Sequence, residues 1–314
     1  MAEPSDLPVE RFRADLQALT KGASQRLGLA VSGGPDSLAM LLLAAAASPG
    51  AVEAATVDHG LRPESASEAI FVAALCERLG VPHAVLRPEE PFAGNLQSSA
   101  REARYRLLEE WRQDRKLDWV ATAHHVQDQA ETLMMRLNRG SGVGGLGGIR
   151  SVNGRIIRPL LGWRRAELSA VVEAAGIDPV SDPGNADDRF DRVRIRTALA
   201  AAEWIDQAAL ARSAAALAEA DEALEWTAER LLLERATAHA SEFQLDPSGL
   251  PAELSRRLLL RLLRQIDPRA MPRGRELSRL LATLESGRPA TLAGIRCSGG
   301  AVWRFERAPP RRSG

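Results

Sequence analysis

Short apolar runs alternate with amphipathic segments from the start of the chain to about residue 175. Each run has the length of a buried β-strand, and the segments between them have helical periodicity or strong helix formers. This alternation predicts an α/β domain of the Rossmann-like kind, in which a parallel five-stranded sheet carries helices on both faces. The expected strands are 26–31, 52–57, 83–86, 119–123 and 156–161, and the expected helices are 7–19, 38–47, 65–79, 96–112, 129–137 and 164–175.

The pattern changes after about residue 196, where alanine- and leucine-rich helical periodicity takes over. The expected elements are helices at 204–240, 251–265 and 275–284 and a hairpin at 290–307 around Ser298-Gly299-Gly300. We therefore expect two domains, an α/β domain at 1–205 and a smaller, mainly helical domain at 206–314. Its last residues, 309–314, are expected to fray.

The stretch Ser32-Gly33-Gly34-Pro35-Asp36-Ser37 joins the first strand to an alanine-rich helix without a gap. Adjacent glycines let the backbone approach a ligand, because no Cβ stands in the way. Pro35 removes an N–H that would be unpaired at a helix start, and the remaining N–H groups and the helix dipole favour an anion. The turn predicts a phosphate site; the alternative is a turn that binds nothing. It has neither the GK[ST] of a Walker loop nor a GxGxxG fingerprint.

Polar side chains follow three of the expected strands. Ser32, Asp58 and the pair His124-His125 each stand just beyond a strand end. Right-handed crossovers bring the carboxyl ends of parallel strands to one edge of the sheet, which is where ligands bind in open α/β folds. We therefore expect these three stretches to form one site.

An acidic helix face follows His125. If the helix begins near Val126, Asp128, Glu131 and Thr132 share a face at i, i+3 and i+4, and His125 stands at the helix start beside them. Such a group suits Mg²⁺ or the ammonium of an amino substrate. The alternative is a capped helix with a solvated acidic face, and the spacing alone does not decide between the two.

Two arginines lie three residues apart on the expected helix at 96–112. A planar guanidinium suits phosphate oxygens, which makes Arg101 and Arg104 candidates for phosphate contacts. The alternative, for at least one of them, is a solvated charged surface of the kind that Glu102 and Arg106 would form at i, i+4.

The densest basic run of the first domain follows the stretch Ser181-Asp182-Pro183-Gly184-Asn185. Its members are Arg189, Arg192, Arg194 and Arg196. Contact with an RNA backbone is one interpretation. A salt-bridged helix start that uses the aspartates at 187, 188 and 191 is the other.

The glycine-rich stretch at 139–148, which begins with Arg139, predicts a loop. Loops of this length in compact domains are usually functional, so a hinge or a substrate-covering loop is one interpretation. A simple long connector is the other.

Composition narrows the class of protein. The 314 residues carry a formal net charge of +0, so no global basic field indicates nucleic acid, although a local patch can hide in a neutral total. Cys76 and Cys297 are far apart, which argues against a disulfide framework, an iron–sulfur cluster or a cysteine zinc site. The amino terminus has no signal-peptide core, and no apolar run reaches the roughly 18 residues that span a bilayer. A soluble, cytoplasmic protein without membrane contact is the default expectation.

Taken together, these motifs resemble one family, the tRNA(Ile)-lysidine synthases, which are N-type ATP pyrophosphatases with an adenine nucleotide alpha hydrolase-like fold. The resemblance covers most of residues 25 to 200 in order. Two departures stand out: Gln127 occupies a position where members often have an acidic residue, and DPGN replaces DPSN. The motifs that carry the resemblance are SGGPDS from Ser32, DHGLRPES from Asp58, ARxxRY around Arg101, HHxxDQAET from His124, RGSGxxGLGG from Arg139, DPGN from Asp182 and RxRIR from Arg192.

The resemblance implies a ligase that uses ATP with Mg²⁺, free L-lysine and a tRNA(Ile) with a CAU anticodon. The C2 oxygen of the wobble cytidine attacks the α-phosphorus, pyrophosphate leaves, and the amine of lysine then displaces AMP to form lysidine. Rival interpretations are a tRNA-thiolating enzyme on the same fold and a non-catalytic nucleotide-binding module. The oligomeric state stays open, with a homodimer as one option, and the second domain is a candidate tRNA contact.

Residue roles follow from the same resemblance. ATP is expected at Ser32, Gly33, Gly34, Pro35, Asp36, Ser37 and Asp58. Asp36 and Asp128 are expected to hold the metal, while His125, Asp128 and Glu131 position lysine or metal and Arg101 lies near the transferring phosphate. Contacts to tRNA or lysine are expected from Arg104, Arg139, Arg192, Arg194 and Arg196.

Overall fold

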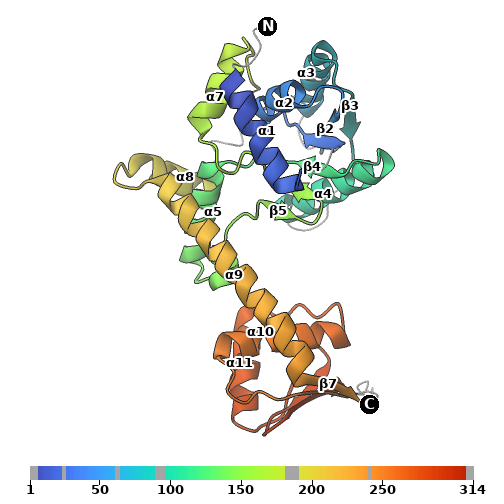
Figure 1. Ribbon diagram of the computed structural model, residues 1–314, viewed down its shortest axis with the longest axis vertical. Helices are drawn as coiled ribbons and strands as arrows, with labels where there is room; N and C mark the ends of the chain where they lie inside the picture. The colour runs from blue at the N-terminus through green and yellow to red at the C-terminus, as the bar shows by residue number, and fades with distance from the viewer. Residues whose placement is uncertain are drawn as a thin grey trace. The chain divides into compact units, whose positions relative to one another are not determined.

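A computed structural model of the chain describes residues 6–22, 26–60, 64–88, 96–180, 191–239 and 242–308. The chain forms two compact units, residues 1–218 and 219–314 (Figure 1). The boundary between them falls inside the long helix α9, Gln207–Arg235. The division at 205/206 that the sequence suggests therefore stays a prediction.

The sheet of the first unit has six strands in the order β3-β2-β1-β4-β6-β5. Five of them are parallel, as expected, and β5 pairs antiparallel with β6 across Gly154, which has a φ of +59°. The expected five-stranded sheet was thus wrong by one strand, because β5 is only two residues long and both are exposed, which is too short for an alternating pattern. The strands are β1 Leu27–Ala30, β2 Val52–Val57, β3 His83–Leu86, β4 Trp119–Ala121, β5 Val152–Asn153 and β6 Ile156–Ile157.

Helices cover both faces of this sheet, as expected (Figure 1). Alternate residues of a strand point to opposite faces, so Leu29 joins the larger core formed with α1, α2, α3 and α7, while Ala30 joins a smaller core under α4. A Cβ at Gly28 would lie 2.6 Å from the Trp111 ring, so glycine lets α4 pack directly on β1. The helices are α1 Asp6–Thr20, α2 Pro35–Ala47, α3 Glu64–Leu79, α4 Leu96–Asp114, α5 Val126–Asn138, α6 Val143–Leu146, α7 Arg165–Ala174 and α8 Asp191–Ala201.

The second unit contains a five-stranded antiparallel sheet in the order β7-β8-β11-β10-β9. The expectation of a mainly helical domain was therefore wrong. The alanine-rich stretch that begins at Ala236 favours a helix by local propensity, but it pairs with β8, and tertiary pairing overrides a weak propensity. The elements after α9 are β7 Ala236–His239, β8 Glu242–Leu245, α10 Ala252–Ile266, α11 Gly274–Glu285, β9 Ala290–Leu292, β10 Ile295–Ser298 and β11 Trp303–Arg307.

The core of the second unit lies between this sheet and the apolar faces of α10 and α11. Leu258, Leu262 and Leu277 pack in one buried cluster with Cys297 and Phe305 from the sheet. The hairpin expected around residues 298–300 is present as β10 and β11. No helix within the described part of the chain is long and apolar enough to cross a membrane.

Candidate active site

The loop between β1 and α2 leaves the amino end of α2 without a side-chain cap. Gly33 has a φ of +84°, and Gly34 stands at the N-cap with no side chain to satisfy the first N–H groups. Ser37 shapes the loop from within: its Oγ donates to the Gly34 carbonyl at 2.9 Å and accepts the Ser32 N–H at 3.2 Å. Free N–H groups at a helix start favour an anion.

A cavity of about 560 Å³ opens at the carboxyl edge of this sheet, and its size is typical of a small-ligand site. The three strand-end stretches meet there, although the second contributes His59 rather than Asp58. The predicted residues in the lining are Ser32, Gly34, Pro35, Asp36, Ser37, Arg104, His125, Asp128, Glu131, Arg192 and Arg196. The other predicted residues, Gly33, Asp58, Arg101, Arg139 and Arg194, are not part of the lining.

His125 links α2, the helix that follows the glycine loop, to α5, the acidic helix. As the N-cap of α5, its Nδ1 accepts the Gln127 N–H at 3.1 Å, so we assign the ring proton to Nε2. Nε2 lies 3.4 Å from Oδ2 of Asp36 and 3.5 Å from Oδ2 of Asp128. Burial alone would lower the pKa of His125, but its hydrogen bond to Asp36 and the charges of both carboxylates outweigh burial and raise it.

Asp36 has an unsatisfied oxygen. Its Oδ1 is buried and has no hydrogen-bond partner among the described residues. A buried carboxylate oxygen without a partner is costly, because it has lost water and gained nothing in return. Asp36 stands in the first turn of α2, next to the glycine loop. Asp36 therefore keeps one buried carboxylate oxygen without a partner beside the glycine loop.

Two arginines of α8 bind the acidic face of α5. Glu131 is only 3% exposed, and its two oxygens accept from Nε of Arg192 and Nε of Arg196, each at 2.7 Å. Arg192 also donates to Oδ1 of Asp128. Burial raises the pKa of Asp128, but the charges of His125 and Arg192 outweigh it, so the pKa is lowered. The acidic face is buried in ion pairs and is not a solvated surface.

Arg104 and Arg101 lie in different surroundings. Arg104 lines the cavity, and no carboxylate within the described residues pairs with it. Burial lowers the pKa of its guanidinium. Arg101 is exposed, stacks on Tyr105 at 5.1 Å and hydrogen-bonds the Tyr105 hydroxyl. Of the two, Arg104 is the one that faces the cavity.

Asp58, just beyond β2, is bonded to residues of its own turn, of α3 and of the segment after β3. Its carboxylate accepts from the Ser65 hydroxyl at 2.7 Å, the Gly60 N–H at 3.0 Å and Nε of Arg87 at 3.0 Å. The bond from Ser65, above all, lowers the pKa of Asp58. With its oxygens engaged and no place in the lining, Asp58 holds the shape of the edge, and its expected contact with ATP stays a prediction.

The remaining basic residues pair with one aspartate. Arg139 and Arg194 both contact Asp191, and all three side chains are more than half exposed. This arrangement matches the salt-bridged helix start weighed above for Arg194. The stretch 181–190, with the DPGN motif, Asp187, Asp188 and Arg189, lies outside the described residues.

The glycine-rich stretch after Arg139 contains a short helix, α6, and is tied back to α5. Arg136 donates to the Gly148 carbonyl at 3.0 Å, while Gln129 accepts the Ile149 N–H at 2.6 Å and donates to the Ile149 carbonyl. A Cβ at Gly148 would lie 2.4 Å from Oε1 of Gln129. The stretch is thus anchored at its carboxyl end, and its role as a hinge or cover stays a prediction.

Several lining residues were not among the predicted site residues, and His124 and Arg165 are two of them. His124 lies beside Thr122, with its Nδ1 3.0 Å from the Thr122 hydroxyl, and burial lowers its pKa to about 3. Its position before His125 at a strand end was the available signal. Arg165 of α7 also lines the cavity, and its backbone N–H donates to Oε1 of Gln127. No sequence pattern indicated that α7 reaches the cavity.

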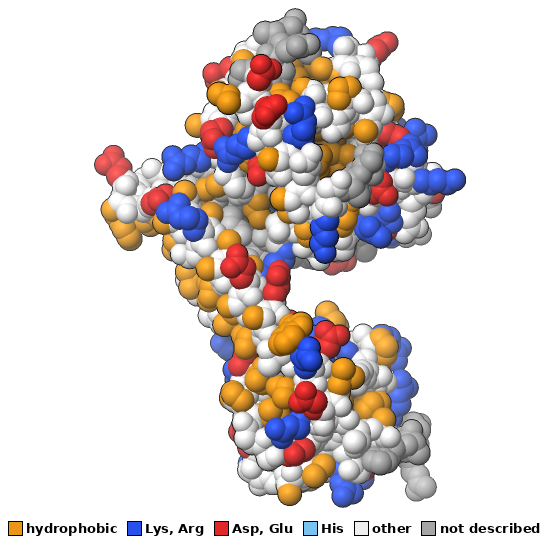
Figure 2. All heavy atoms as spheres, in the orientation of Figure 1, with side chains coloured by type: hydrophobic (Ala, Val, Ile, Leu, Met, Phe, Trp, Pro, Cys, Tyr) orange, Lys and Arg blue, Asp and Glu red, His pale blue; other side chains and the backbone are white. Residues whose placement is uncertain are grey.

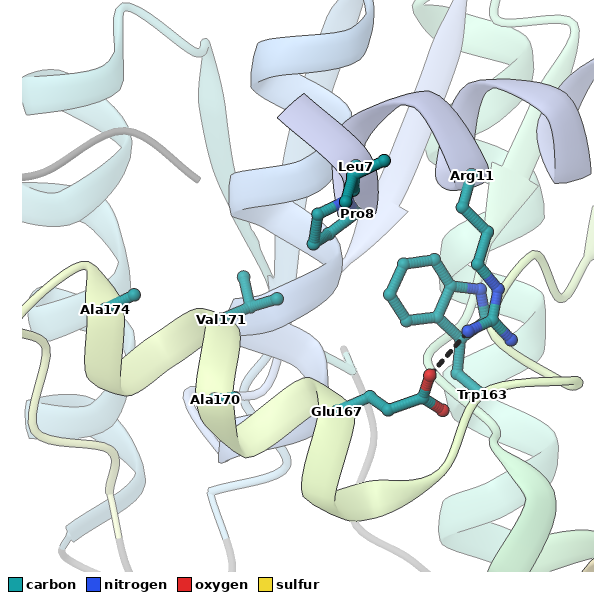
Figure 3. A pocket seen from close by; sticks show the side chains of 8 residues that line it. All are labelled: Leu7, Pro8, Arg11, Trp163, Glu167, Ala170, Val171 and Ala174. Atoms are coloured by element: carbon teal, nitrogen blue, oxygen red, sulfur yellow. Dashed lines mark hydrogen bonds and ion pairs between the residues drawn. The ribbon is translucent and has the colours of Figure 1, made fainter. Parts of the chain in front are cut away.

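A second hollow, of about 380 Å³, lies between α1 and α7 (Figure 3). Arg11 stacks over the Trp163 ring at 4.2 Å and pairs with Glu167 at 2.6 Å, which satisfies the charges at its rim. The Trp163 indole donates to Asp15, and its carbonyl accepts the Val126 N–H at the start of α5. This hollow contains none of the predicted site residues, and its tryptophan supports the helix that carries the site.

Comparison with known proteins defines the class of domain to which the first unit belongs. A family model described as the PP-loop domain matches residues 8–203, which include the whole glycine loop and the acidic helix. Among solved structures, the U34-tRNA thiolase NcsA from Methanococcus maripaludis superposes with a TM-score of 0.57 at 17% identity, over 68% of this chain and 81% of that chain. That likeness shows the fold alone. The first unit is therefore a PP-loop ATP-binding domain.

Relatives of known family match nearly the whole chain. A tRNA(Ile)-lysidine synthase of Novosphingobium aromaticivorans is 49% identical over 311 residues, covering 96% of this chain and 94% of the relative. Another, from Zymomonas mobilis, is 44% identical and covers 94% of this chain and 92% of the relative. The chain belongs to the tRNA(Ile)-lysidine synthase family of ATP-dependent ligases, as the motifs indicated.

Proposed function

We propose that this ligase adenylates the C2 oxygen of the wobble cytidine in a CAU anticodon of tRNA(Ile) and then joins free L-lysine to C2. In the first step the oxygen bonds to the α-phosphorus of ATP and pyrophosphate leaves. In the second step the lysine amine bonds to C2, AMP departs with the oxygen, and the amine loses a proton. The observation that carries the proposal is that the phosphate loop and the paired carboxylates of α5 line one cavity.

The triphosphate is assigned to the glycine loop and the amino end of α2. Ser32, Gly34 and Ser37 line the cavity there, and the helix start has no competing side-chain cap. Arg104 supplies a half-buried positive charge with no carboxylate partner among the described residues. A guanidinium fixed in a low-dielectric site stabilises the charge that builds on a transferring phosphoryl group. Arg104 therefore fits the role near the reacting phosphate better than the exposed Arg101.

Mg²⁺ is assigned to Asp36. Magnesium usually binds one or two carboxylates together with substrate phosphates and water. The buried, unpartnered Oδ1 of Asp36 suits such an ion, whereas both oxygens of Asp128 are already engaged by His125 and Arg192. No cluster of three or more metal-binding side chains occurs within the described ranges. The ion would supply charge neutralisation for the departing pyrophosphate.

The lysine amine is assigned to Asp128 and Glu131. Both carboxylates face the cavity, and each already holds a cationic group in the free protein. Carboxylates in this setting attract an ammonium, and holding the amine next to the adenylated base converts a bimolecular attack into a positioned one. His125 fixes the orientation of Asp128, since its backbone N–H donates to Oδ2 at 3.0 Å.

Contacts to the tRNA body are assigned to the second unit. Residues 254–308 contain twelve arginines against four acidic residues, a basic bias that the neutral total conceals. Exposed members at the end of α10 and along α11 include Arg264, Arg275 and Arg279. On the face of the first unit shown in Figure 2, Lys/Arg and Asp/Glu side chains are interspersed. Basic side chains on one element are the usual footprint of a nucleic-acid backbone.

The two rival interpretations, a tRNA-thiolating enzyme and a non-catalytic nucleotide-binding module, fit the structure less well. A thiolating enzyme needs reactive cysteines, but Cys76 and Cys297 are fully buried in different units, and burial raises the pKa of each thiol to about 12. A module that only binds nucleotide would have no use for the buried carboxylate pair of α5.

The deciding experiment supplies the purified protein with ATP, Mg²⁺, labelled lysine and a CAU-anticodon tRNA(Ile), with a methionine tRNA as control. Lysine on the isoleucine tRNA alone supports the proposal. Adenylation without lysine transfer would support the first step and show that lysine is not the amine donor. ATP binding with no reaction on either tRNA would favour the binding module.

A further inference from the structure

Arg192 occupies the position that an incoming ammonium would take. Its guanidinium bridges Oδ1 of Asp128 and Oε2 of Glu131, which lie one helical turn apart on α5. The two carboxylate side chains are 16% and 3% exposed, while that of Arg192 is 36% exposed. The carboxylates are thus buried parts of the cavity wall, and Arg192 is the more exposed and more adaptable member of the group.

Glu131 does not depend on Arg192 alone. Nε of Arg196 holds the other oxygen, Oε1, at 2.7 Å. Asp128 likewise keeps the His125 N–H and the nearby imidazole. If Arg192 turned away, Asp128 would expose Oδ1 and keep its contacts at Oδ2, and Glu131 would keep Arg196, whose Nη2 also lies 3.5 Å from Oε2. An uncompensated buried charge, which is strongly destabilising, would therefore not arise.

The charges of this group are balanced. Asp128 and Glu131 carry two negative charges, and Arg192 and Arg196 carry two positive ones. A diamine entering such a group would add positive charge only. L-lysine brings a carboxylate in addition to its two ammonium groups, so one ion pair inside the protein can be exchanged for two ion pairs with the substrate.

We propose that Arg192 is an exchangeable occupant of the amine site and, once displaced by the substrate's ammonium, binds the substrate's carboxylate. The inference rests on the proposed function and assigns to one residue the discrimination between an amino acid and a plain amine. Arginine suits this role, because its planar fork binds a carboxylate through two parallel hydrogen bonds. Lysine at this position would offer a single point charge.

The test compares L-lysine with 1,5-diaminopentane, which has the same chain and both amines but no carboxylate. Both amines are titrated against CAU-anticodon tRNA(Ile) with ATP and Mg²⁺, and KM and kcat are recorded. The proteins are the wild type, Arg192→Ala, Arg192→Lys and, as a control on another helix, Arg212→Ala. Arg212 is exposed and pairs only with Asp206 among the described residues. ATP affinity and thermal unfolding are measured for each, so that a misfolded variant is recognised.

We expect the wild type to have a KM for lysine at least about tenfold below its KM for diaminopentane. Arg192→Ala should raise the KM for lysine about tenfold and leave that for diaminopentane unchanged or lower, so the preference disappears. Arg192→Lys should keep part of the preference, and Arg212→Ala all of it. A wild type without preference, or an alanine variant that weakens both amines equally, overturns the inference while the proposed function stands. If no amine reaches the tRNA although ATP binds, the proposed function itself fails.

Discussion

Nε2 of His125 lies 3.4 Å from Oδ2 of Asp36 and ties the first turn of α2 to the amino end of α5. The two residues are far apart in the chain and belong to the two stretches with the most chemical information. Their contact holds the phosphate loop and the acidic helix in one orientation. It also occupies Oδ2 of Asp36, which leaves the buried Oδ1 without a hydrogen-bond partner among the described residues.

Asp36→Asn should abolish most adenylation with little effect on folding. The amide keeps the size of the side chain and its contact with His125 but lacks the charge that an ion on Oδ1 requires. We expect pyrophosphate release to fall by about 100-fold or more, measured with saturating tRNA and ATP. ATP affinity without Mg²⁺, followed by calorimetry, should change little. Full activity in Asp36→Asn or Asp36→Ala would rule out the metal role.

The two glycines of the loop should differ in their tolerance of alanine. Gly33 has a φ of +84°, where a Cβ costs about 1–2 kcal/mol, whereas Gly34 has a φ of −76° and only the Ser32 Oγ, at 3.8 Å, near the position of a Cβ. Gly33→Ala should therefore lower the free energy of urea unfolding of the ATP-free protein by about that amount relative to Gly34→Ala. Equal stabilities would mean that the loop adopts another conformation.

Arg104→Ala should impair adenylation more than Arg101→Ala does. Arg104 lines the cavity without a carboxylate partner among the described residues, and Arg101 is exposed on Tyr105. Removing a fixed charge that faces a reacting phosphate typically lowers the rate by about 100-fold. Initial rates of pyrophosphate release in the two variants give the comparison. A larger loss in Arg101→Ala would show that the bound state draws Arg101 into the cavity.

His124 should make the free protein less stable as the pH falls. Burial lowers the pKa of His124 from its ordinary 6.5 to about 3, so the folded state favours the neutral ring. The stability that this contributes is complete above about pH 6.5 and is lost as the pH falls toward 3. Relative to His124→Asn, the free energy of unfolding of the wild type should drop by about 1.4 kcal/mol per pH unit between about pH 6 and 4. Parallel curves from denaturant titrations would contradict the buried, neutral ring.

Arg275→Ala combined with Arg279→Ala should weaken tRNA binding without affecting ATP. The two side chains are exposed at i, i+4 on α11. Each lost phosphate contact should reduce the slope of log affinity against log salt by about one. Binding of tRNA is followed at several salt concentrations, with Glu285→Ala as the control on the same helix. An unchanged salt slope would show that this helix does not contact the tRNA.

The sequence by itself determined the α/β alternation, the loop at residues 32–37 and the start of the acidic helix. Each depends on neighbours in the chain: apolar spacing sets the strands and helices, and caps and glycines set the turns. The convergence of Ser32 and the His124-His125 pair also followed, because parallel strands with right-handed crossovers allow only one arrangement of their ends.

Only the tertiary structure decided which charged residues meet. Arg192 and Glu131 lie 61 positions apart, so no local pattern distinguishes the pair of Arg192 with the buried Glu131 from the surface pair of Arg194. Nor does a local pattern distinguish Arg104, which lines the cavity, from Arg101, which does not. Likewise, the alanine-rich residues of β7 form a strand only because β8 pairs with them. Burial and pairing between distant segments set these outcomes, since the free energy of a charge or of an edge strand depends on what packs against it.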